Sequence, residues 1–427
     1  WDVARFGDWA DKAFTKARVG DQYAKRFAIH FPNEERDAGR PVRTRPAHAV
    51  QTALGGVFGL NYGWEHVQWF ADKPGAKDTN GFTRQNWFEP VGRECRMLRD
   101  AAGIIDISNF AKYRVSGQQA EAWLNAVFAN TMPKAVGRSC LTPLIGIRGG
   151  IAGDFTVTRL AEDEFMIIGS GMAERYHQRF WKMVPMPEAV RFESQTEALC
   201  GFNVAGPKSR ELLQRLTNTS LATGDFPFMR SKRIELAGVD CLALRVSFTG
   251  DLGWELHCKT EDQLRLYEAL LDCAKEFNAG PVGARALMSL RVEKGYGSWS
   301  REYSPEYWPQ EVGLDGLIKL DKEFLNKQAY LAIKDQTPRE RLSIIEIISP
   351  DNADATGGEP IFDKSGAGVG RVTSGTYGYG VNKSLALCYL KNVTAGDSLD
   401  VMILGKPHHS IVLPEAPFDP KGEKLRA

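Results

Sequence analysis

The sequence after Thr337-Pro338 constrains the fold more tightly than any other part of this chain. It consists of short apolar runs at intervals of about ten residues, with Gly, Asn and Asp between them. The runs are RLSIIEI, EPIFD, VGRVTSGTYGYG, SLALCYL, LDVMIL and HSIVLP. Short, closely spaced strands separated by turn residues are typical of an all-β barrel or sandwich. We therefore expect residues 337–427 to form a small C-terminal β-barrel.

The part before it mixes strands and helices. Apolar residues recur at threes and fours over 87–102 and 119–129, which predicts helices, and the segment 110–117 between them resembles a strand. Residues 142–170 alternate short apolar runs with glycine turns, as antiparallel hairpins do. Because strands and helices do not alternate strictly, the sequence predicts an α+β fold and not a doubly wound sheet. Neither a Walker loop nor a Rossmann fingerprint occurs, and the glycine-rich segment 366–370 is expected to be a hairpin turn.

The first eighty residues differ in sequence pattern from both of these parts. Residues 2–26 carry apolar and aromatic side chains at helical intervals with no N-terminal Met, and we expect the last helix of a preceding domain. The Pro- and Arg-rich GRPVRTRPAH and the aromatic GVFGLNYGWEHVQWFAD that follow are expected to wrap another surface. KPGAKDTN at 73–80 has turn residues and no apolar period. With roughly 100–200 residues per domain, we expect divisions at 1–80, 81–336 and 337–427.

Charge and cysteine usage exclude several classes of function. The chain has 54 Lys and Arg against 53 Asp and Glu, a net charge of +1, so no general field attracts nucleic acid or an anionic membrane. It has no run of about 18 apolar residues, and residues 1–20 do not form a signal peptide. We expect no nucleic-acid or membrane partner, and a protein of the cytoplasm or of an organelle matrix. The seven cysteines are scattered without CxxC spacing, which predicts neither disulfides nor a metal site.

Three short stretches contain candidate functional residues, and two of them are rich in glycine. GGIAGD at 149–154 has paired glycines that permit close approach of a ligand, with Asp154 at the start of the next strand. On these residues alone, a tight hairpin with Asp154 in the turn is the commoner structure. SLRVEKGYGSW at 289–299 reads as a helix end closed by glycine, where Trp299 could line a site or belong to the core.

The remaining stretch is SFTGDLGWELH, residues 247–257. If it contains a strand, Trp254 and Leu256 face one side while Glu255 and His257 face the other. A carboxylate held there could accept two parallel N–H donors from a heterocycle with an amino-amide edge. The alternative is a solvated face of the strand.

In this order and with these neighbours, the stretches resemble the folate-binding aminomethyltransferase family, which includes the glycine-cleavage T-protein. The resemblance runs from about Trp87 to Leu413, through RDAAGIIDISNFAKYRVSG, RGGIAGDFTVTRL, FNVAGPKSRELLQRL, RVSFTGDLGWELH, SLRVEKGYGSW and VGRVTSGTYGYG. Residues 39–72 resemble the segment that joins the flavin domain to the folate domain in dimethylglycine and sarcosine dehydrogenases. The chain is therefore similar to the C-terminal half of such an enzyme. Residues 1–80 would be the remnant of the flavin domain with the linking segment, and FAD would belong to the N-terminal half that is missing here.

The resemblance implies tetrahydrofolate as the cofactor of this chain and a role for several residues. Asp154 corresponds to the acidic residue beside the reactive folate nitrogens, where it orients the pterin and assists proton transfer. Glu255 corresponds to the carboxylate that binds the pterin amino-amide edge. The positions that match the rest of the pocket are Phe248, Ser170, Phe110 and Trp299. T-proteins often have Tyr in place of Phe248 and Asn in place of Ser170.

Anchoring of the folate carboxylates is where the sequence departs from the family pattern. T-proteins place an Arg-Asp pair ahead of the helical Arg, and this chain reads ARALMSLR there. Arg285 and Arg291 are both candidates for the anchor. At Ser300 the family often has Gly, a change expected to narrow the pocket.

The implied function is the capture of a one-carbon unit. Oxidation of an N-methyl amine yields an iminium that water hydrolyses to formaldehyde, whereas N5 and N10 of tetrahydrofolate can take up the carbon as 5,10-methylenetetrahydrofolate. That reaction needs positioning above all, with Asp154 assisting proton transfer. The implied partners are the flavin-binding domain of the same protein and a small N-methyl amine of the dimethylglycine or sarcosine type. Two alternatives stay open, namely a non-catalytic binding or regulatory protein of the same fold and a folate-dependent O- or S-demethylase.

Overall fold

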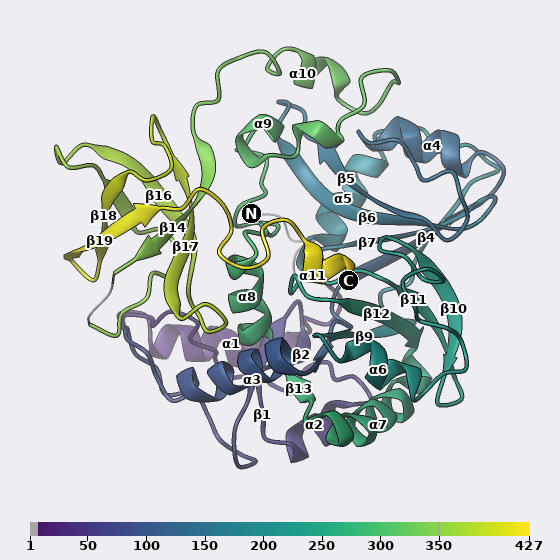
Figure 1. The fold of residues 1–427 in the computed structure, drawn as a ribbon, viewed down its shortest axis with the longest axis horizontal. Coiled ribbons are helices and arrows are strands. Elements are labelled where there is room, and N and C mark those ends of the chain that lie inside the picture. The colour runs from purple at the N-terminus through teal and green to yellow at the C-terminus, as the bar shows by residue number, and fades with distance from the viewer. Residues whose placement is uncertain (1–6, 349–350) are drawn as a thin grey trace.

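Two β-sheets and a β-barrel surround one central helix in the computed structural model, which describes residues 7–348 and 351–427. Figure 1 shows the barrel on the left, the two sheets one above the other on the right, and α8 (Ala284–Glu293) near the centre. α8 contacts barrel strand β16 and the helix α3 (Phe88–Asp100). The α+β fold with a C-terminal barrel that the sequence predicts is confirmed.

The lower sheet has six strands in the order β10-β11-β12-β9-β3-β13. They are β3 (Gly103–Asp106), β9 (Leu199–Ala205), β10 (Ser231–Leu236), β11 (Val239–Leu244), β12 (Gly253–Lys259) and β13 (Gly280–Val282). All pairs are antiparallel except β13 with β3. One face carries a core that includes Phe202, Trp254 and Leu256 and packs on α6 (Ser209–Gln214) and α7 (Gln263–Ala274).

The upper sheet has five antiparallel strands in the order β5-β6-β7-β4-β8. They are β4 (Ala111–Ser116), β5 (Ser139–Ile145), β6 (Ile151–Ala161), β7 (Glu164–Gly169) and β8 (Arg191–Ser194). Its outer face packs through Tyr113 and Phe155 on α4 (Ala120–Val127) and α5 (Glu174–Trp181). The predicted strand at 110–117 and the predicted hairpin strands at 142–170 are therefore confirmed.

The inner faces of the two sheets meet in a small apolar contact. Met166 and Ile168 of β7 pack against Leu242 and Leu244 of β11, with Phe110 beside them. Side chains directly opposite one another on neighbouring strands share a face of the sheet. This contact therefore identifies which residues of the other strands point into the space between the sheets.

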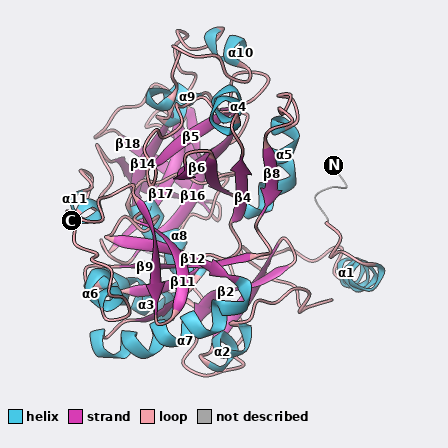
Figure 2. Ribbon diagram, turned by 90° about the vertical axis from the view of Figure 1, so that its right-hand side faces the viewer, coloured by secondary structure: helices cyan, strands magenta, loops and turns pink. Residues whose placement is uncertain are grey.

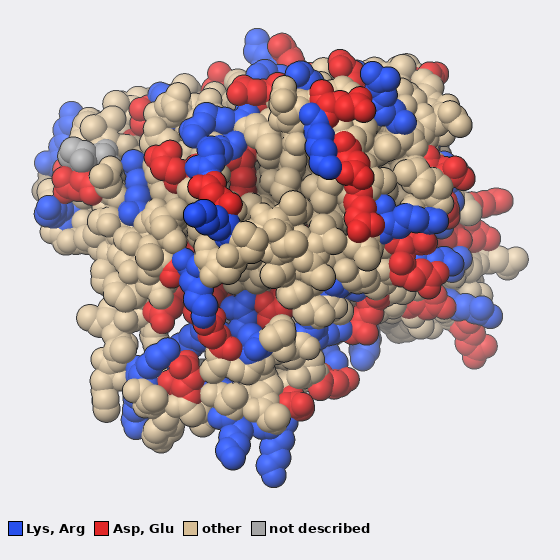
Figure 3. Space-filling model, turned by 90° about the horizontal axis from the view of Figure 1, so that it is seen from below, with Lys and Arg blue, Asp and Glu red and all other residues tan. Residues whose placement is uncertain are grey.

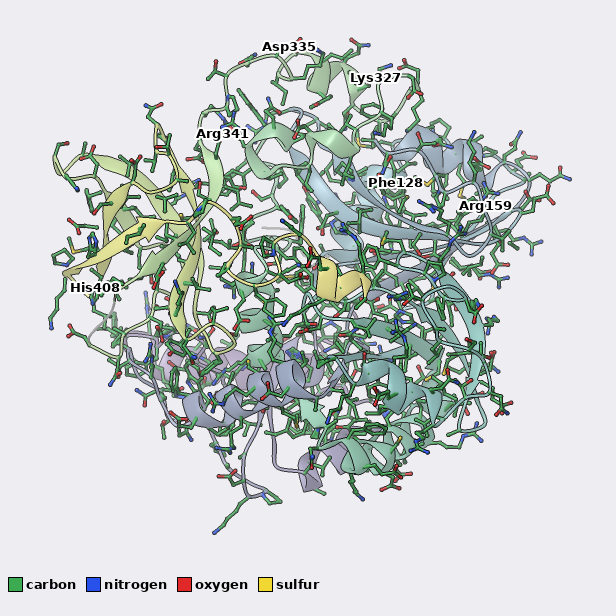
Figure 4. The ribbon with its side chains drawn as sticks, in the orientation of Figure 1. Phe128, Arg159, Lys327, Asp335, Arg341 and His408 are labelled. Carbon is green, nitrogen blue, oxygen red and sulfur yellow. The ribbon has the colours of Figure 1, made fainter. Side chains whose placement is uncertain are left out.

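The C-terminal unit is a closed barrel in the order β14-β17-β16-β15-β18-β19. Its strands are β14 (Arg341–Ile347), β15 (Pro360–Phe362), β16 (Gly368–Gly378), β17 (Lys383–Leu390), β18 (Ser398–Ile403) and β19 (Lys406–Val412). Each of the apolar runs after Pro338 thus contributes a strand, and the glycine-rich 366–370 lies at the hairpin between β15 and β16. Figure 4 labels Arg341, which begins β14, and His408 on β19.

The chain begins with a helix that stands away from the lower sheet, and the elements that follow it lie along that sheet. The elements are α1 (Lys12–Ala24), α2 (His48–Ala53), β1 (Gly56–Asn61) and β2 (Trp64–Phe70). α1 has no buried residue and stands apart from the body of the molecule in Figure 2. The predicted helix at 2–26 is confirmed for the range of α1, while residues 1–6 lie outside the described part of the chain.

The remaining helices are short. They are α9 (Pro309–Val312), α10 (Lys327–Leu331), α11 (Glu423–Arg426) and the 3₁₀ turns η2 (Gly171–Ala173), η3 (Thr260–Asp262), η4 (Lys275–Phe277) and η5 (Asp315–Leu317). None of the helices in the described ranges is long and apolar enough to cross a membrane. Acidic and basic side chains are interspersed on the face shown in Figure 3.

Candidate functional site between the two sheets

Asp154 lies on a strand and not in a turn. The hairpin between β5 and β6 turns at residues 146–150, where the Gly146 N–H donates to the Gly150 carbonyl at 2.8 Å. Asp154 follows on β6, opposite Pro143 of β5. The interpretation of Asp154 as a turn residue is therefore wrong, because the glycines alone make the turn. The glycines also permit close packing, since a Cβ on Gly150 would overlap the carbonyl oxygen of Pro305.

Three of the predicted site residues form one row at the end of the upper sheet. Thr156 of β6 is opposite Ile168 of β7, so the same register sets Asp154 opposite Ser170, immediately after β7 ends. Gly169 is opposite Ala111 of β4, which in turn aligns Ser170 with Phe110. Asp154, Ser170 and Phe110 thus occupy neighbouring register positions on three adjacent strands. They share the face that carries Ile168, which is the face toward the lower sheet.

The protein environment of Asp154 favours its neutral form. Burial raises the pKa of this carboxyl group from 3.8 to about 6. Asp154 in turn contributes to the raised pKa of Tyr303, although burial is the larger cause there. A carboxyl group that titrates near neutral pH can both accept and return a proton during a reaction.

Glu255 extends from the facing sheet. It is on β12, opposite Leu244 on one side and Asn203 on the other, so its side chain lies on the inner face with Leu244. Trp254 is on the opposite face, in the core against the helices, as the strand pattern predicts. The Glu255 side chain is only 16% exposed, so the alternative of a solvated face is wrong.

The oxygens of Glu255 are open to a ligand. Burial lowers the pKa of the neighbouring His257, whose Nε2 lies 3.6 Å from Oε2, and among the described residues the Glu255 carboxylate accepts no hydrogen bond of normal length. A carboxylate in a recess with unused lone pairs is suited to accept two N–H donors from a planar heterocycle. Phe110 packs on both cores that border this recess, next to Ile105 on one side and Leu244 on the other.

Two further predicted residues lie at the borders of this space. Phe248 is half-buried and stacks on Tyr296 with ring centroids 5.9 Å apart. Trp299 makes an edge-to-face contact with His177 at 4.9 Å and packs in the cluster that contains Tyr303, the neighbour of Asp154.

The two candidate arginines line a different cavity. Arg285 and Arg291 both border a cavity of about 190 Å³ between α8, the segment before α3 and the barrel, and neither Asp154 nor Glu255 lines it. Arg291 is fully buried and pairs with Glu302 at 2.8 Å. Arg285 donates two hydrogen bonds to the carboxylate of Asp78, at 2.7 and 3.0 Å. The structure thus brings these arginines together, but each already has a carboxylate partner.

The backbone at Ser300 adopts a conformation that favours glycine. Its φ is 67°, a left-handed conformation that side chains with a Cβ adopt at a cost. The side chain is exposed and its hydroxyl approaches the Met172 sulfur at 3.7 Å.

Sequence reasoning missed several polar residues beside the site. Lys112 and His257 are buried near Glu255, and the sequence of β4, AKYRVS, has no pattern that marks Lys112 as buried. His177 is fully buried beneath Trp299 with no partner for either ring nitrogen among the described residues, and burial lowers its pKa to about 3. No sequence pattern marks His177 or Tyr303.

Comparison with known proteins covers nearly the whole chain. Residues 47–322 match the GCVT N-terminal domain, residues 341–419 the glycine cleavage T-protein C-terminal barrel domain, and residues 1–44 the FAD dependent oxidoreductase central domain. The chain is 34% identical to mitochondrial dimethylglycine dehydrogenase of Mus musculus, over 97% of this chain and 48% of that protein. It is 30% identical to 4-methylaminobutanoate oxidase (formaldehyde-forming) of Paenarthrobacter nicotinovorans, over 100% of this chain and 52% of that protein.

The relatives are enzymes, and the chain spans about half of their length. Among solved structures, the glycine cleavage system aminomethyltransferase T from Bartonella henselae superposes with a TM-score of 0.76 and 21% identity, over 88% of this chain and 98% of that chain. That likeness concerns the fold. From the family match over more than half of its residues, the chain belongs to the aminomethyltransferase (glycine-cleavage T-protein) family and is related to the dimethylglycine dehydrogenases.

Proposed function

We propose that this chain binds tetrahydrofolate between its two sheets and captures a one-carbon unit as 5,10-methylenetetrahydrofolate. The observation that carries the proposal is the pair of carboxylates on facing sheets. Asp154 titrates near neutral pH, and Glu255 presents open acceptor oxygens. Asp154 is suited to proton transfer at a nucleophilic nitrogen, and Glu255 is suited to bind the amino-amide edge of a pterin.

The residues present match a reduced pterin in polarity. Phe110 supplies an apolar surface between the sheets, and Ser170 supplies a small hydroxyl in register with Asp154. Folate itself supplies the two nucleophilic nitrogens. The chain's contribution would be to hold the ring against Glu255, to hold the reacting nitrogen at Asp154, and to exclude water from the bond-forming carbon.

The proton balance gives Asp154 a defined task. Capture of an iminium forms two carbon–nitrogen bonds to folate and breaks the bond to the amine. Two protons leave the folate nitrogens, of which one remains on the released amine and one goes to the medium. Asp154 as a carboxylate would accept such a proton and pass it on, a contribution typically worth about 10²–10⁴-fold in rate.

The test compares folate binding with one-carbon transfer. The purified chain is given tetrahydrofolate and formaldehyde, and formation of 5,10-methylenetetrahydrofolate is followed above the uncatalysed rate. Asp154→Asn should retain folate binding by fluorescence titration and lose at least about 10²-fold of the catalysed rate. Asp163→Asn, in the exposed turn between β6 and β7, should behave as the parent protein. Unchanged transfer by Asp154→Asn would refute the role. In a separate incubation with tetrahydrofolate and an O- or S-methyl donor, transfer of the methyl group to give 5-methyltetrahydrofolate would favour a demethylase instead.

We further propose that a flavin-binding half of the same protein, carrying FAD and oxidising a small N-methyl amine, is the partner of this chain. Support comes from the match of residues 1–44 to an FAD dependent oxidoreductase domain and from the names of the relatives. It also comes from large apolar side chains that are exposed on and just after α1, including Tyr23, Phe27 and Ile29, of which Phe27 is 93% exposed. The names of the mammalian relatives suggest the mitochondrial matrix in a eukaryote, and the cytoplasm otherwise.

The partner proposal is tested by association in solution. A separately produced flavin-binding half should bind this chain, and the double change Tyr23→Ser and Phe27→Ser should weaken that association without altering folate binding. Association that is indifferent to both substitutions would refute this surface as the contact.

A further inference from the structure

A buried lysine faces the carboxylate that the proposed function assigns to the pterin. Lys112 is on β4, opposite Ile168 of β7, and Glu255 is on β12, opposite Leu244 of β11. Ile168 and Leu244 pack in the same contact between the sheets, so Lys112 and Glu255 point toward each other's sheet across it. Burial is the largest influence on the pKa of Lys112 and lowers it, while Glu255 is one of the smaller influences that raise it. Burial also lowers the pKa of His257, and Lys112 lowers it further.

The ammonium group of Lys112 is held by carbonyl oxygens. Its Nζ donates to the backbone carbonyls of Ser108 and Phe110, both at 2.9 Å, and the residue is fully buried. Burial, with a smaller contribution from Arg45, lowers the pKa of Lys112 to about 8, so the side chain is still charged at neutral pH. A charged lysine in this position is costly for the fold, since no carboxylate contacts it directly.

The other charged groups around Lys112 are engaged elsewhere. Arg45 donates to the carbonyls of Ser108 and Thr196 and stacks on an indole ring. The carboxylate of Asp106 accepts from two glutamine side chains and from a backbone N–H. The Cys200 thiol hydrogen-bonds to a threonine hydroxyl. Glu255, beside His257, is the carboxylate of this group whose oxygens remain free.

We propose that Lys112 is a positioning residue for the pterin site, because its positive charge keeps the Glu255 carboxylate ionised when a pterin covers it. This inference rests on the proposed function. Binding of the ring removes water from Glu255, which favours uptake of a proton. A protonated carboxyl group offers a donor where the pterin edge needs an acceptor. A cation that faces the carboxylate opposes that change.

The experiment measures the dissociation constant of tetrahydrofolate by fluorescence between pH 6 and pH 8. The dissociation constant of the parent protein should be nearly independent of pH once the effect of Asp154, measured in Asp154→Asn, has been subtracted. Lys112→Gln should bind about tenfold more weakly at pH 6 than at pH 8. Lys112→Arg retains the charge and should restore the level profile. The same loss in Lys112→Arg, or a level profile in Lys112→Gln, would overturn the inference.

Two controls separate this inference from a structural effect and from the proposed function. Lys322 also donates Nζ to two backbone carbonyls, those of Asn125 and Phe128, and burial lowers its pKa to about 8. Its ammonium group reaches the C-terminal end of α4, next to Phe128, which Figure 4 labels. Lys322→Gln should lower stability but leave the pH profile of folate affinity level. A pH-dependent loss in Lys322→Gln would overturn the inference.

The double variant Lys112→Gln with Glu255→Gln identifies the group that takes up the proton. It should lose the pH dependence of Lys112→Gln, because the glutamine in place of Glu255 cannot ionise. Persistence of the pH dependence in the double variant would overturn the inference. If the parent protein does not bind tetrahydrofolate at all, the proposed function itself fails.

Discussion

Replacing Asp154 by Asn is expected to make the protein more stable while it removes catalysis. Burial raises the pKa of Asp154 from 3.8 to about 6, so ionisation of this group at neutral pH opposes folding. The full shift corresponds to about 3 kcal/mol, and solvent screening of the partly exposed side chain reduces the expected gain to about 1–2 kcal/mol. Active sites commonly carry such a cost, because the group is placed for chemistry and not for stability.

The sign of the pH dependence follows from linkage. The folded protein binds the Asp154 proton more tightly than the unfolded chain does, so stability falls as pH rises from about 3.8 to about 6 and is level above that range. Asn carries no proton to lose. The advantage of Asp154→Asn should therefore be largest at pH 7.5 and only about a third as large at pH 4.5.

Thermal unfolding at these two pH values measures the effect. At about 2–4 °C per kcal/mol, the melting temperature of Asp154→Asn should rise by about 2–8 °C at pH 7.5. Asp163→Asn, in the exposed turn between β6 and β7, should leave the melting temperature unchanged at both values. Destabilisation by Asp154→Asn, or an equal gain at both pH values, would show that the carboxyl group is not held in the surroundings described above.

Three other substitutions test separate parts of the structure. Arg291→Met leaves Glu302 as an unpaired buried charge and should cost about 3–5 kcal/mol in denaturant unfolding, whereas replacing both by Met should cost much less. Ser300→Gly relieves a φ of 67° and should add about 0.5–1 kcal/mol to the same free energy of unfolding. Gly150→Ala brings a Cβ against the Pro305 carbonyl oxygen and should lower the melting temperature and the yield of folded protein.

The sequence predicted those elements whose signal is local. Each barrel strand is a short apolar run between turn residues, and β12 shows strict alternation, with Trp254 toward the core and Glu255 away from it. Period and turn chemistry act over a few residues, so they can be read without knowing the partner strands. The row of Asp154, Ser170 and Phe110 needed more than this, because its residues are brought together by the register of three strands.

The arginines and Lys112 could not be predicted, for different physical reasons. Whether Arg285 and Arg291 are free to bind a ligand depends on their ion-pair partners, Asp78 and Glu302. No local sequence pattern reveals those pairs. A lysine inside a strand normally points to solvent, with only its stem covered. At Lys112 a second sheet covers that face, and the carbonyl oxygens of Ser108 and Phe110 replace water.

The two facing sheets provide different surroundings for two carboxylates that the sequence presents in similar ways. Asp154 is near the start of β6, close to Tyr303, where burial favours its neutral form. Glu255 is within a strand, with Lys112 facing it from the other sheet and His257 beside it. An acid–base group must exchange its proton near neutral pH, whereas a group that accepts two N–H donors must not hold one. Separate sheets permit both, because the surroundings of one carboxylate can change while those of the other stay the same.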